Sequence, residues 1–91
     1  MIIEEEVEFH KETCKKLTLL FETKRHDYGQ TTTDSWKKFG PVSILVRMGD
    51  KLGRLETLLV QNKSEPHHEK IEDTLLDLAN YAIIALCNGV V

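Results

Sequence analysis

The chain has 91 residues, of which 41% are hydrophobic and 30% are charged, with a formal net charge of −3. This length fits a single domain over residues 1–91, and the balance of residue types excludes a wholly disordered chain. The slight acidic excess excludes a generally basic nucleic-acid-binding surface, so nucleic acid is not the expected partner. The sequence shows no signal peptide and no apolar run long enough to span a membrane. We therefore expect a soluble, cytoplasmic protein with no membrane partner.

Three long segments have the period of amphipathic helices, and none alternates like a strand. Residues 3–25 form the first, Gly40-Pro41 opens the second, and residues 66–88 form the third, stopped by Asn88-Gly89. Residues 26–40 break the pattern with three threonines, which predicts a long loop holding one short turn. The sequence thus predicts a small all-α bundle of three long helices, with a long loop between the first two.

The second helix carries a seam of large apolar residues spaced for lengthwise packing on another helix: Leu45, Met48, Leu52, Leu55 and Leu59. Gly49 and Gly53 lie on a second face of this helix. Each glycine lowers the stability of the helix by about 1 kcal/mol relative to alanine. Close approach of another helix would compensate, and we expect the chain to form a homo-oligomer. Cys14 and Cys87 lie in apolar helical patterns, and we interpret both as buried, reduced thiols.

Two polar stripes and a group of aromatic residues are candidate functional features. Arg47, Lys51 and Arg54 surround one carboxylate and could hold phosphate, or they could form a solvated face with weak ion pairs. The third helix carries a stripe of oxygen-bearing side chains: Glu69, Asp73, Asp77 and Asn80. These side chains could bind Mg²⁺, or the acids could complement the helix dipole at the surface. Three aromatic residues of the loop could stack on a base or pin the loop to the bundle: Tyr28, Trp36 and Phe39.

These motifs occur in a recognisable order: HDYG, WKKFG, ILVRMGDKLGRLETL and EKIEDTLLDLANYAIIAL. Over roughly residues 24–86 the chain resembles the nucleotide-modification-associated helical domain of phages and bacteria. It is more distantly similar to the MazG-like all-α nucleotide pyrophosphohydrolases. The first resemblance implies a nucleotide-binding protein of phage or bacterial nucleotide metabolism. The second implies a Mg²⁺-dependent nucleoside triphosphate pyrophosphohydrolase with Asp50, Glu69 and Asp73 as catalytic acids.

The chain departs from the MazG-like pattern at Lys51, Arg54 and Lys70, which stand where that pattern has carboxylates. Cations at these positions weaken a Mg²⁺ site but can hold phosphates directly, so we expect nucleotide binding with weak or absent hydrolysis. The expected site comprises three groups of residues. The phosphate contacts are Arg47, Lys51 and Arg54, the base contacts are Tyr28 and Trp36, and the metal ligands are Asp50, Glu69, Asp73 and Asp77.

An alternative function does not require catalysis. The chain would then be a helical interaction protein that sequesters a nucleotide signal or binds a host protein through the face of Gly49 and Gly53.

Overall fold

A computed structural model describes residues 1–25, 31–61 and 68–89, and every regular element in these ranges is helical. The elements in chain order are α1 (Ile3–Thr23), α2 (Thr31–Phe39), α3 (Val42–Glu56), the π-helical turn η2 (Thr57–Gln61) and α4 (His68–Cys87). The all-α prediction is confirmed, but the prediction of three helices is wrong because α2 forms inside the predicted loop. Of the predicted loop over residues 26–40, residues 26–30 lie outside the described residues.

Local charge and packing explain why α2 is a helix. Asp34 lies in its first turn and Lys37 and Lys38 in its last, so both ends complement the helix dipole. Thr32 is fully buried, and Trp36, one turn later, packs against the main core cluster. The helix penalty of threonine is only a few tenths of a kcal/mol, and tertiary packing outweighs it.

The connection from α2 to α3 depends on the left-handed backbone of Gly40, whose φ is +74°. Its N–H donates a hydrogen bond to the carbonyl of Trp36 at 2.7 Å, which ends α2. A side chain would strain this conformation, because L residues other than glycine rarely adopt it. Pro41 caps α3, so the predicted opening at Gly40-Pro41 is confirmed within one residue. Gly89, with φ of +75°, follows the end of α4 in the same way.

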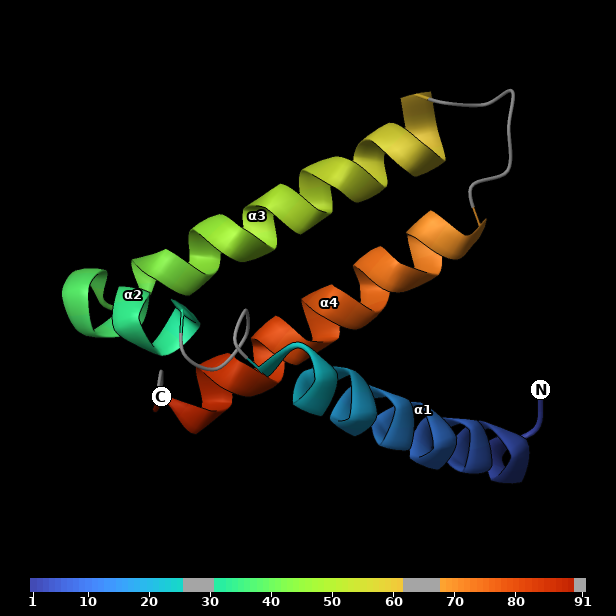
Figure 1. Ribbon diagram of the computed structural model, residues 1–91. Coiled ribbons are helices and arrows are strands. Elements are labelled where there is room, and N and C mark those ends of the chain that lie inside the picture. The colour runs from blue at the N-terminus through green and yellow to red at the C-terminus, as the bar shows by residue number, and fades with distance from the viewer. Residues whose placement is uncertain (26–30, 62–67, 90–91) are drawn as a thin grey trace.

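The helices α3 and α4 lie side by side and supply most of the core (Figure 1). Ile44 from α3 packs with Tyr81 and Ile84 from α4, and all three side chains are buried. Partly buried side chains from α1, α2, α3 and α4 surround this cluster: Leu20, Phe21, Trp36, Met48 and Ala85. The short helix α2 lies beside the N-terminal end of α3, so Trp36 reaches the same cluster.

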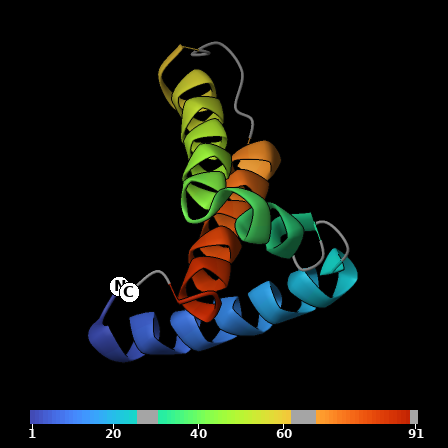
Figure 2. The ribbon, with the colours of Figure 1, turned by 90° about the vertical axis from the view of Figure 1, so that its left-hand side faces the viewer.

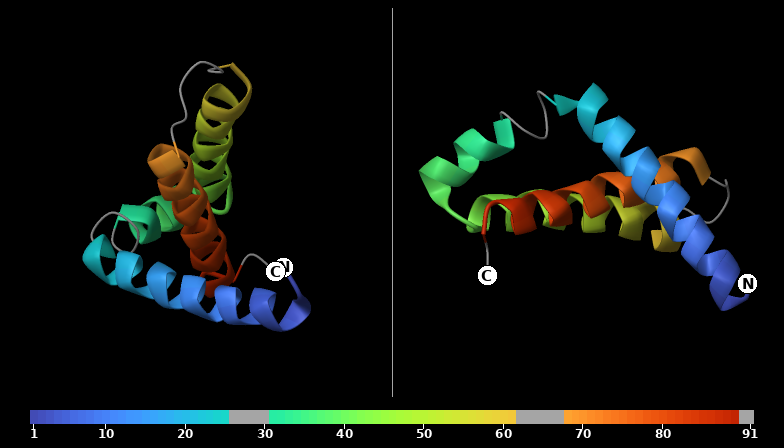
Figure 3. Two further views of the ribbon diagram at one scale, coloured as in Figure 1. Left: turned by 90° about the vertical axis from the view of Figure 1, so that its right-hand side faces the viewer. Right: turned by 90° about the horizontal axis from the view of Figure 1, so that it is seen from below.

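The first helix, α1, crosses α4 and runs away from α3 (Figures 2 and 3). Leu17 is its buried residue, and most of its remaining side chains are exposed. Between α1 and α4 lies a mostly apolar groove of about 340 Å³, with Cys14 and Cys87 among its lining residues. Both cysteines are free and exposed, so the prediction of burial is wrong. The apolar stripe of α1 is only partly covered because α4 meets it at a crossing.

The predicted seam of α3 is divided between two environments. Leu55 is buried and Met48 packs against the core, as the lengthwise packing predicts. Leu45, Leu52 and Leu59 are exposed, so no helix among the described residues covers them, and their packing on another helix stays a prediction. The division arises because α4 covers only the face that contains Ile44 and Leu55.

Candidate functional site

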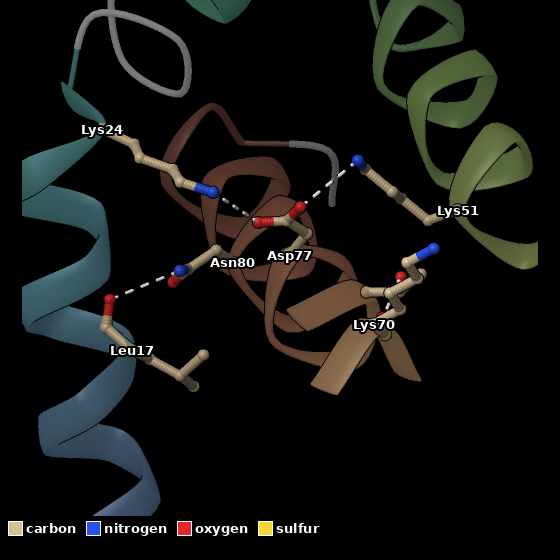
Figure 4. Close-up of polar contacts among 7 residues, drawn as sticks. Leu17, Lys24, Lys51, Lys70, Asp77 and Asn80 are labelled. Carbon is tan, nitrogen blue, oxygen red and sulfur yellow. Dashed lines mark hydrogen bonds and ion pairs between the residues drawn. The ribbon is translucent and has the colours of Figure 1, made fainter. Parts of the chain in front are cut away.

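Three helices meet at the carboxylate of Asp77 on α4 (Figure 4). The ammonium nitrogen of Lys51, from α3, lies 3.2 Å from one carboxylate oxygen, and that of Lys24, at the end of α1, lies 3.9 Å from the other. The side chain of Asp77 is 15% exposed and that of Lys51 is 27% exposed. A carboxylate so largely removed from water needs charged or hydrogen-bonding partners. The cluster therefore braces α1 and α3 against α4 and carries a local excess of positive charge.

Further polar contacts attach α1 to α4 on either side of this cluster. The buried side chain of Asn80 donates a hydrogen bond to the carbonyl of Leu17 at 3.3 Å. Lys16 donates to Glu72 at 2.8 Å on the exposed surface. This hydrogen bond holds the pKa of the Glu72 carboxyl below its usual value and raises the pKa of Lys16. Asp77, Asn80 and Glu72 thus give α4 three polar contacts with α1.

A separate groove of about 400 Å³ opens between α2 and α3. It is lined by residues of both helices: Ser35, Phe39, Val42, Ser43, Val46, Arg47 and Asp50. Phe39 is 63% exposed, and the Lys38 ammonium lies 5.4 Å from the centre of its ring. The groove therefore combines a guanidinium, two hydroxyls, one carboxylate and an aromatic ring within the volume range of small-molecule sites.

The three cations of the predicted stripe have different surroundings. Arg47 lines the groove with Asp50, whereas Lys51 contacts α4 and Arg54 is exposed. At about 100° per residue, positions i, i+4 and i+7 lie within about 60° of one another, so the three residues share one side of α3, but α2, α4 and solvent give each of them different surroundings. Among the described residues, no ion pair joins Asp50 to Arg47 or to Arg54.

The predicted metal ligands do not form a group of three within the described residues. Asp50, Asp73 and Asp77 have described side chains, and no three acids, histidines or cysteines among the described residues could hold a metal ion. A cation at Asp77 would also have to displace or share its lysine partners. The side chain of Glu69 and all of Tyr28 lie outside the described residues, and the predicted magnesium site stays a prediction.

The aromatic residues of α2 have two different surroundings. Trp36 packs against the core cluster, which is the pinning alternative that the sequence left open. Its stacking on a base stays a prediction. Phe39, one of the three aromatic residues considered for base stacking, is exposed at the groove but was not among the expected base contacts, and Ser35 and Ser43 were not predicted at all. Helical spacing in TTTDSWKKF would have placed Ser35 and Phe39 on one side of a helix, but this segment was interpreted as a loop.

Residues 24–88 match the family model described as nucleotide modification associated domain 1. The chain belongs to this family. The matched part contains α2, α3 and α4, and with them the groove and the Asp77 cluster, whereas α1 lies outside it. The family-level resemblance is thereby confirmed with nearly the same boundaries. No curated protein and no solved structure matches the chain. Among the described residues, no helix is both long and apolar enough to cross a membrane.

Proposed function

We propose that this member of the nucleotide modification associated domain 1 family binds a nucleotide, or a small molecule derived from one, in the groove between α2 and α3. The observation that carries the proposal is that Arg47, two serine hydroxyls and the exposed ring of Phe39 line one groove. Charge, hydrogen bonding and an aromatic face are the three features that phosphate, sugar and base require. The family's association with nucleotide modification supports the same class of ligand.

Each lining residue has a proposed role. The planar guanidinium of Arg47 binds a phosphate with two parallel hydrogen bonds. The Ser43 hydroxyl donates to the carbonyl of Gly40 at 2.8 Å, which leaves its oxygen to accept a hydrogen bond from the ligand. Phe39 stacks on the base, a contact worth about 1–3 kcal/mol. Lys51 and Arg54 stay predicted phosphate contacts, and Lys51 would have to share its ammonium with Asp77.

We further propose that the protein binds its ligand with little or no hydrolysis. Lys51 occupies a position where the MazG-like pattern has a carboxylate, and it is engaged with Asp77. If hydrolysis occurs, the expected reaction is attack of water at a nucleotide α-phosphorus with release of pyrophosphate, assisted by Mg²⁺. The proposed setting is the cytoplasm of a bacterium, or of the bacterial host of a phage.

The experiment is a thermal-shift panel of nucleotides, cyclic nucleotides and nucleic acids with and without Mg²⁺, followed by calorimetric titration of the best ligand. A ligand specific for the fold raises the melting temperature. We expect Arg47→Ala to weaken binding about tenfold or more, because a charge-assisted hydrogen bond contributes roughly 1.5–3 kcal/mol. Phe39→Ala is expected to weaken binding with little change in salt dependence, since stacking is not an ionic contact.

Matched controls lie on α1, outside the groove. Lys15→Ala removes an exposed cation and Phe9→Ala removes an exposed ring, and both variants are expected to bind like the wild type. Wild-type affinity in both Arg47→Ala and Phe39→Ala would contradict the proposed groove. Loss of affinity in Lys51→Ala and Arg54→Ala alone would move the site toward the cations first indicated by the sequence.

A second candidate, a helical interaction protein without catalysis, is favoured by a different observation. The described residues include more exposed than buried large hydrophobic side chains. Such a surface is typical of a chain that associates with another chain.

A further inference from the structure

The outer face of α3 is apolar and has no partner among the described residues. We define this face by the residues that share it: Val42, Leu45, Val46, Gly49, Leu52 and Gly53. Its four large side chains are more than half exposed, with Leu45 at 66%. A Cβ placed on either glycine would meet no atom within 4 Å. The two glycines therefore lie in open space, and their cost in helix stability is not offset by a neighbouring helix within the described chain.

We propose that this face packs against the same face of a second copy of the chain, with the two α3 helices antiparallel. A twofold interface places one patch against itself, and the outer face suits this arrangement. Its centre, at Gly49 and Gly53, is small, and larger side chains flank it on both sides. The flanking side chains of one copy can enter the depression over the glycines of the other, as ridges pack into grooves.

The charges beside this face are complementary under the same symmetry. Asp50 and Arg54 lie on one flank of the face, both are exposed, and neither forms an ion pair among the described residues. In an antiparallel twofold pair the same flanks meet, and residues equally far on either side of the crossing point lie opposite one another. If the two α3 helices cross at Leu52, which lies between Gly49 and Gly53 in the sequence, Asp50 of one copy lies opposite Arg54 of the partner subunit. The twofold symmetry forms this Asp50–Arg54 pair twice in one dimer. An unrelated partner has no reason to carry both charges at matching positions, so the complementarity favours a second copy of the chain.

This arrangement also completes the groove, a consequence that rests on the proposed function. Val42 and Val46 belong both to the outer face and to the lining of the groove. Within one chain, Arg54 is seven residues from Arg47, which is roughly 10 Å along the helix axis. In the proposed dimer, Arg54 of the partner subunit lies level with Asp50, which is three residues from Arg47. Its distance from Arg47 along that axis is therefore only about 4.5 Å. The partner would thus supply a second cation for the phosphates.

The test uses charge reversal in two separate variants, read by light scattering at high micromolar concentration. We expect about 21 kDa for the wild type, twice the 10.5 kDa of one chain. Asp50→Arg and Arg54→Asp should each lower the mass to about 10.5 kDa, because each places like charges opposite one another. Mixing the two variants should restore about 21 kDa, since the positive pair of one chain then faces the negative pair of the other. A local folding defect would not be repaired by mixing.

Lys37→Asp, an exposed charge reversal on α2 rather than on α3, is the matched control and should keep the wild-type mass. A wild-type mass of 10.5 kDa would overturn the proposal. A dimer unaffected by both reversals, or a mixture that stays monomeric although circular dichroism shows both variants folded, would also overturn it. A dimeric wild type that binds no nucleotide would contradict only the proposed function. Nucleotide binding to a monomeric wild type would contradict only this interface.

Discussion

The paired helices α3 and α4 differ sharply from α1, although all three have amphipathic sequences. Ile44, Leu55, Tyr81 and Ile84 are buried between or beside α3 and α4, whereas the 21 residues of α1 bury Leu17 alone. The family match begins at residue 24, just where α1 has ended. An apolar period therefore indicates that a helix has a face to cover, but not that the same chain covers it. In this protein the family region supplies the core, and α1 is attached to it through a few contacts.

The largest effect should come from the core of the paired helices. Ile84 is 5% exposed and packs with Ile44 and Tyr81. We expect Ile84→Ala to reduce the free energy of unfolding by about 2–5 kcal/mol, through lost burial and the cavity that remains. Urea denaturation followed by circular dichroism measures this change. Leu86→Ala, on an exposed position of the same helix, should cost about 0.5 kcal/mol or less. Equal costs would mean that the core has been wrongly located.

Loss of the buried residue of α1 should release that helix and leave the others in place. Leu17→Ala removes the contact that buries α1 on α4, at an expected cost of about 2 kcal/mol. Hydrogen exchange should then show lost protection in α1 and retained protection in α3 and α4, because parts of a protein can open separately. The exposed Leu19→Ala is the control. If protection falls equally in all helices, α1 is part of one cooperative unit.

The Asp77 cluster joins both regions, so its loss should have an intermediate effect. Asp77→Asn keeps the shape of the side chain but removes the charge that faces Lys24 and Lys51. We expect the free energy of unfolding to fall by about 1–2 kcal/mol, since both lysines can still reach water. Denaturant titration measures it, with the exposed Asp73→Asn as control. A stabilised Asp77→Asn variant would instead show that the buried carboxylate is retained at a cost in stability, as at a ligand site.

The smallest effect should come from the exposed pair of Lys16 and Glu72. Because the folded state lowers the pKa of Glu72, its contribution is present above the ordinary glutamate pKa of about 4.3 and is lost as the pH falls below it. Glu72→Gln should therefore remove a small part of the acid dependence of the melting temperature and change little else. Melting curves recorded between about pH 3 and about pH 7 test this expected loss of acid dependence. Unchanged acid dependence would mean that the pair does not hold α1.

The ends of helices were predictable because their signals are local. Gly89 adopts the left-handed conformation that ends a helix, and this stop was predicted at Asn88-Gly89. The start of α3 at Gly40-Pro41 was predicted in the same way. The helix α2 was not, because its threonines oppose a helix locally while Thr32 and Trp36 favour it through burial against other segments. The candidate site was likewise only partly predictable from the sequence. Arg47 and Asp50 were identified, whereas Phe39 was considered for stacking but left out of the expected site, because its place in the groove depends on α2 being helical.

By itself the sequence determined the helical period of α1, α3 and α4, the start of α3, the stop at Asn88-Gly89 and the family, all of which follow from neighbouring residues and from motifs in order. Only the tertiary structure decided which side of each helix is covered. That choice separated Leu55 from Leu52 and turned Lys51 toward Asp77 while Arg47 lines the groove. The physical reason is that helical period sets the angles between side chains, whereas the covered side is set by helices that are distant in the chain.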